Sequence, residues 1–70
     1  MNKDIMEGKW EQAKGHVQKK WGELTNDELD EIKGSSKVLA GKLQERYGYS
    51  KEKAEEEIDA FYQNNPDFYK

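Results

Sequence analysis

Residues 15–22 read GHVQKKWG, and residues 41–48 read GKLQERYG, 26 positions further along the chain. Both stretches begin and end with glycine, and both place an aromatic residue, Trp21 or Tyr47, directly before the second glycine. The same shift of 26 brings all six glycines into register, because they lie at positions 8, 15, 22 and 34, 41, 48. Self-similarity at a fixed separation indicates an internal repeat. We interpret the chain as a duplication of one structural unit.

The first unit has the pattern of two helices. Its apolar residues recur at steps of three and four, which places them on one face of a first helix. They are Met6, Trp10, Ala13, Val17, Trp21 and Leu24. Gly22 is suited to end this helix in a left-handed conformation. Thr25 and Glu28 have the spacing of a capping box, which predicts a short second helix near residues 26–33 that buries Leu29 and Ile32.

The second unit repeats this plan. One of the serines after Gly34 is expected to cap a third helix, which Gly48 ends. Ser50 is expected to cap a fourth helix that runs to about residue 64, before Pro66. The inward-facing residues of these two helices are Leu39, Leu43, Tyr47, Ala54, Ile58 and Phe61. The pattern leaves open whether Gly34 separates the second and third helices or only kinks one continuous helix.

Two hairpins of helices follow from this pattern, and neither hairpin can cover its own apolar face. We therefore expect an all-α fold in which the two hairpins pack on each other, related by an approximate two-fold axis. The expected helical domain spans residues 1–64, with one hairpin at 3–33 and the other at 36–64. Residues 65–70 form a short C-terminal tail in this prediction.

Composition limits what such a domain can do. The 70 residues are only 33% hydrophobic, carry a net charge of −3 and have a mean hydropathy of −1.31. A core of this size rarely supplies more than about 3–5 kcal/mol of stability. The chain has no cysteine and no apolar run long enough to span a membrane, and its beginning lacks the apolar stretch of a signal peptide. We therefore expect a cytoplasmic protein that makes no membrane contact.

Charge alternates with the repeat. Residues 1–22 and 35–50 each carry a net charge of +2, whereas residues 23–34 carry −4 and residues 51–70 carry −3. The first helix of each hairpin is thus basic and the second is acidic. This pattern favours ion pairs within the fold, although exposed pairs contribute only about 0–1 kcal/mol each.

The motifs WGELTNDE at residues 21–28 and GKLQERYG at residues 41–48, followed by Ala54 and Glu55, resemble those of the CsbD-like bacterial stress-response proteins. The resemblance extends from Met1 to about Tyr62, with Ser35 and Ser36 as a departure from the expected charged residues. It implies a small all-helical fold of two orthogonally packed α-hairpins and expression under general stress. It implies no catalytic residue.

The residues offer no evident catalytic, cofactor-binding or metal-binding site. His16 is the only histidine, it lies off the apolar face, and no carboxylate stands three or four positions away to orient it as a base. The carboxylates of residues 55–57 are consecutive on a helix, so they point in different directions and cannot converge on one ion. The glycines, seven positions apart, do not form a phosphate-binding loop. We expect no enzyme and no cofactor.

Two candidate surfaces remain. Phe68 and Tyr69 in the tail, together with Gly8 and Gly15 opposite the apolar face, are candidates for contact with a protein partner or a second copy, although we expect a monomer. A candidate basic face consists of Lys9, Lys14, Lys19, Lys20, Lys42 and Arg46.

Three functions are consistent with this sequence. The first is a hydrophilic stress protein that acts as a protectant or as a helical interaction module. The second is a weak nucleic-acid-binding module, which the sequence pI of 5.1 argues against. The third is a partner-docking adaptor.

Overall fold

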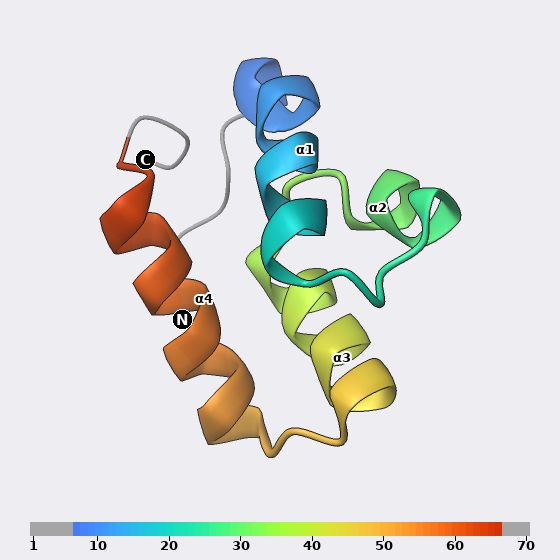
Figure 1. Ribbon diagram of the computed structural model, residues 1–70, viewed down its shortest axis with the longest axis vertical. Coiled ribbons are helices and arrows are strands. Elements are labelled where there is room, and N and C mark those ends of the chain that lie inside the picture. The colour runs from blue at the N-terminus through green and yellow to red at the C-terminus, as the bar shows by residue number, and fades with distance from the viewer. Residues whose placement is uncertain (1–6, 67–70) are drawn as a thin grey trace.

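The computed structural model describes residues 7–66 and shows an all-α arrangement, as predicted. A single 3₁₀ turn, η1 (Glu7–Lys9), leads into α1 (Trp10–Lys20), which is followed by α2 (Asn26–Ile32), α3 (Ser36–Tyr47) and α4 (Lys51–Asn64). Figure 1 shows α4 on the left, α1 and α3 in the middle and α2 on the right, with α3 and α4 joined at the bottom of the view. Helix α3 packs against both α4 and α2, so it is the central element of the fold.

The predicted core is confirmed within the described residues, except that Tyr47 is only partly buried. The buried apolar residues are Trp10, Ala13, Val17, Trp21, Leu24, Leu29, Ile32, Leu39, Ala40, Leu43, Ala54, Ile58, Phe61 and Tyr62. Ala40 and Tyr62 are additions to the prediction, whereas Tyr47 and Tyr49 are only partly buried against the core. Met6, the first residue of the predicted apolar stripe, lies outside the described residues.

The end of the first helix differs from the prediction, because Gly22 is not left-handed. Helix α1 ends at Lys20, and its C-cap residue Trp21 has φ −122° and ψ 80° and donates its backbone N–H to the Val17 carbonyl at 2.9 Å. The positive-φ glycines of the described chain are Gly34 and Gly48. Five residues separate α1 from α2, whereas three separate α3 from α4. The longer connection turns without a left-handed residue, and the shorter one uses Gly48.

The capping box of the second helix is confirmed in full. The Thr25 hydroxyl accepts a hydrogen bond from the Glu28 N–H at 3.2 Å, and the Glu28 carboxylate accepts one from the Thr25 N–H at 3.0 Å. Two donors that have no partner within the helix are thereby satisfied. Helix α2 then ends at Lys33 (φ 49°), and Gly34 follows with φ 86°. Two successive left-handed residues break the helix, so α2 and α3 are separate helices.

Serine caps begin the last two helices, as predicted. The Ser35 hydroxyl accepts from the Val38 N–H at 3.3 Å, and the Ser50 hydroxyl accepts from the Lys53 N–H at 3.0 Å. Gly48 ends α3 with φ 68° and donates its N–H to the Gln44 carbonyl. Helix α4 ends at Asn65, directly before Pro66. Local hydrogen bonds therefore set the beginnings of α3 and α4 and the end of α3.

Replacing two glycines by alanine should have opposite effects on stability. Gly15 is exposed within α1, and a Cβ atom there would meet nothing within 4 Å. Gly15→Ala is expected to raise the free energy of unfolding by about 0.5–1 kcal/mol, because glycine has poor helix propensity. Gly48→Ala is expected to lower it by about 1 kcal/mol, because an L side chain is strained at positive φ. Thermal unfolding followed by circular dichroism measures both. A fall for Gly15→Ala would show instead that this face is covered by a partner.

Candidate functional site

The most developed polar cluster surrounds α2. Its centre is the carboxylate of Glu28, a residue that is only 7% exposed. The Arg46 guanidinium, from α3, places its Nε 3.1 Å from Oε1 and 3.0 Å from Oε2 of this carboxylate. Since the same carboxylate also accepts the Thr25 N–H, Glu28 both caps its own helix and binds α2 to α3. Burial of a charged group is tolerated here because it is paired and hydrogen-bonded.

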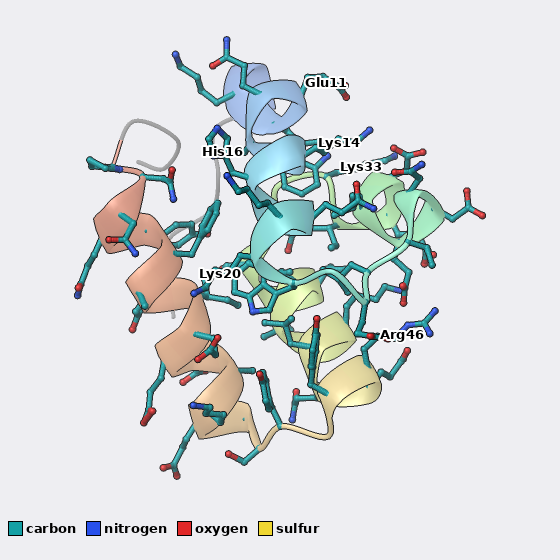
Figure 2. The ribbon with its side chains drawn as sticks, in the orientation of Figure 1. Glu11, Lys14, His16, Lys20, Lys33 and Arg46 are labelled. Atoms are coloured by element: carbon teal, nitrogen blue, oxygen red, sulfur yellow. The ribbon has the colours of Figure 1, made fainter. Side chains whose placement is uncertain are left out.

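Two further ion pairs join α2 to its neighbours. Lys14 of α1 lies 2.9 Å from Asp30, and Lys42 of α3 lies 3.0 Å from Glu31. Figure 2 shows Lys14 on the side of α1 that faces α2. Lys14 also lies 3.8 Å from Glu11 of its own helix. The three pairs that involve Glu28, Asp30 and Glu31 are called the α2 cluster below.

These contacts change proton affinities in the direction that favours the charged forms. The hydrogen bond from Arg46, and next the one from the Thr25 backbone, hold the pKa of Glu28 below its ordinary value of 4.5. The hydrogen bond to Asp30 raises the pKa of Lys14, and the hydrogen bond to Glu31 raises that of Lys42. Glu28, Lys14 and Lys42 are therefore charged at neutral pH.

Acid should lower the free energy of unfolding, because Glu28 becomes protonated. A carboxyl group whose pKa is lowered by folding stabilises the protein above its unfolded pKa and loses this contribution as the pH falls through its folded pKa. The free energy of unfolding should therefore decline as the pH falls below about 5. Glu28→Gln should be less stable at pH 7 and should show a flatter decline. Urea unfolding at a series of pH values measures this, with Glu52→Gln on the exposed face of α4 as the control. Parallel curves for native protein and Glu28→Gln would contradict the assignment.

The structure divides the candidate basic face. Lys14, Lys42 and Arg46 converge on α2, where each is paired with a carboxylate. Lys20 extends instead toward α4, where its Nζ lies 3.9 Å from Glu57 and 5.5 Å from the centre of the Trp21 ring. Figure 2 shows Lys20 on this side of α1. Lys9 and Lys19 form no ion pair with the residues that the structure describes.

Pairing of these cations should suppress binding to nucleic acids, whose affinity depends on neutralised phosphates. We expect no saturable binding of a labelled 20-base-pair duplex at low salt, measured by fluorescence anisotropy up to about 100 μM protein. A triple variant, Glu28→Gln with Asp30→Asn and Glu31→Gln, releases three cations and should bind measurably, with an affinity that falls as salt is added. Saturable binding by the native chain would contradict this expectation.

The structure describes one of the other candidate surfaces, at Gly8 and Gly15, but not the candidate residues of the tail. Gly8 and Gly15 are exposed, and a Cβ atom at either position would meet nothing within 4 Å. Neither glycine is therefore required by a close contact within the described chain. Phe68 and Tyr69 lie outside the described residues. His16 is exposed on α1.

Chemically, the described residues form no recognisable reaction centre. Within residues 7–66, no group of three His, Asp or Glu side chains is placed to hold a metal ion. Trp21 carries a buried indole Nε1 that has no hydrogen-bond partner in the described part of the chain. None of the described helices is both long enough and apolar enough to cross a membrane. The described side chains pack the core and form ion pairs. The sequence alone does not identify which cation pairs with which carboxylate.

Comparison with known proteins places this arrangement among small bacterial proteins. A family model described as CsbD-like matches residues 4–56. The UPF0337 protein YjbJ of Escherichia coli K12 is 52% identical over 58 residues, which cover 83% of this chain and 84% of that protein. A UPF0337 protein of Pseudomonas aeruginosa is 51% identical over 61 residues, covering 87% and 94%. Another, from Protochlamydia amoebophila, is 56% identical over 61 residues, covering 87% and 92%.

Proposed function

The chain belongs to the CsbD-like family, and on this premise we propose that it is a non-catalytic stress protein of the bacterial cytoplasm that protects other proteins through its hydrated surface. The observation that carries this proposal is the contrast between the surface and the core. Among the described residues, Val38 is the one large hydrophobic side chain that is exposed, at 38%. The other apolar side chains of residues 8–66 are wholly or partly buried, so the surface of this part of the chain consists mainly of charged and polar groups.

Such a surface favours solubility over adhesion. Large exposed apolar patches mark surfaces that bind other proteins, and the one exposed valine of residues 8–66 does not form such a patch. Charges of both signs are interspersed, and 39% of all residues are Asp, Glu, Lys or Arg. Mixed charge keeps a protein dispersed at high concentration. A protein of this kind can separate labile neighbours during drying or heating without binding them tightly.

The ion pairs support the same interpretation. Lys14, Lys42 and Arg46 are held by carboxylates of α2, which leaves fewer free cations to attract anionic partners. The net charge is small, at −3. Long-range electrostatic attraction to one specific partner is therefore weak at physiological salt, where charges are screened beyond about 8 Å.

A drying assay tests the proposal. Lactate dehydrogenase is dried and rehydrated with the native chain, or with an inert globular protein of the same size at the same mass concentration. The native chain is expected to preserve more enzyme activity. Leu43→Asp, which places a charge at a fully buried core position, should unfold the chain and reduce protection, because the opened core exposes apolar surface that associates with the enzyme.

The two controls separate the alternatives. Equal activity with the native chain and with the inert protein would overturn the protectant proposal. Equal protection by native chain and Leu43→Asp would show that composition protects without the fold. Circular dichroism before drying establishes that the native chain is folded and that Leu43→Asp is not.

A further inference from the structure

A groove of about 410 Å³ lies along the outer side of the α3–α4 hairpin. Its lining residues are Lys37, Ala40, Gly41 and Gln44 from α3 and Lys51 and Glu55 from α4. The volume falls within the range of about 300–1,000 Å³ that is typical of sites for small molecules. The groove is separate from the α2 cluster, with which it shares no residue.

The floor of the groove is made of small residues. Gly41 is exposed within α3, and a Cβ atom there would meet nothing within 4 Å, so the packing of the chain does not require glycine at this position. The missing side chain leaves the floor open beside Ala40. Val38, the exposed large hydrophobic residue, stands three positions before Gly41 and hence beside it on the helix surface. The groove therefore has a floor of small residues, and Val38 stands near it on the helix surface without lining it.

The charges of the groove are unequal at its two ends. Lys37 stands in the first turn of α3, whereas Lys51 and Glu55 stand in the first two turns of α4, which begins where α3 ends. Because Lys51 and Glu55 are four positions apart on one helix, their charges offset each other locally. No carboxylate within residues 8–66 forms an ion pair with Lys37 or Lys51, unlike the lysines of the α2 cluster. The lining thus carries one excess positive charge, and the uncompensated cation is at the Lys37 end.

We propose that this groove binds a small amphiphilic anion, specifically a free medium-chain carboxylate. The carboxylate lies against the Lys37 ammonium, and the alkyl chain lies over Ala40 and Gly41 toward Gln44. Lys51 and Glu55 at the opposite end carry no net charge together, so the carboxylate is attracted to the Lys37 end and the ligand has one orientation. This binding goes beyond the protectant function and does not depend on it.

Octanoate, below its micellar concentration, is the test ligand, and amide chemical shifts of the full chain in ¹⁵N-labelled form are the readout. Saturable shifts are expected in residues 37–44 and 51–55. Acetate has the charge without the alkyl chain, and octanol has the alkyl chain without the charge. Each should bind with at most a tenth of the affinity of octanoate. Absence of shifts, shifts spread evenly over the chain, or equal effects of acetate or octanol would overturn the proposal.

Matched variants locate the site. Gly41→Leu should fill the floor and abolish octanoate binding. Gly15→Leu is its control, because Gly15 is also an exposed helical glycine with nothing within 4 Å of a Cβ atom, and it should bind like the native chain. Lys37→Glu should weaken binding at least tenfold, whereas Lys19→Glu on α1 should not. Native affinity in either Gly41→Leu or Lys37→Glu would overturn the proposal, and the second variant remains informative if the first fails to fold.

Discussion

Helix α2 is the constraint on which the rest of the structure depends. It has seven residues, and an isolated helix of this length is not stable in water. Yet Leu29 and Ile32, both 1% exposed, must be held in the core by it. The Glu28 carboxylate resolves this difficulty, because one side chain caps the helix at Thr25 and also receives Arg46 from α3. Local and tertiary interactions therefore coincide in one residue, and the short helix keeps its position.

Much of the fold is readable from the sequence because its signals are local. Thr25 and Glu28 are three positions apart, so their capping box follows from helix geometry without any knowledge of the tertiary structure. Ser50 begins α4 and Gly48 ends α3 for similarly local reasons. The apolar steps of three and four predict the buried residues correctly, because a helix on the outside of a small core has one inward face. Tyr62 was missed because an aromatic next to Phe61 lies at the edge of that face.

The features that the sequence did not predict depend on which residues the tertiary structure brings together. The excess of acid in one helix and of base in another indicates that pairs form, but only the packing decides that Lys42 meets Glu31 while Lys9 meets no described carboxylate. The helix end at Gly22 was wrong for a related reason. Gly22 resembles Gly48 in its local sequence, but the connection between the helices is longer there, and the chain turns with Trp21 in a non-helical conformation. The candidate groove is also tertiary, because its lining comes from two helices and its floor is defined by a side chain that is missing.

Two of the ion pairs involve basic residues at equivalent positions of the sequence repeat. Lys20 and Arg46 occupy equivalent positions in the repeated motif, 26 residues apart. Lys20 of α1 reaches Glu57 in α4, and Arg46 of α3 reaches Glu28 in α2. The two acidic partners do not occupy equivalent positions, because a shift of 26 from Glu28 falls on Ala54 and not on Glu57. The two pairs differ in strength, since Lys20 lies 3.9 Å from its partner and Arg46 binds both oxygens of a nearly buried carboxylate. The shorter helix α2 therefore has the stronger of the two contacts.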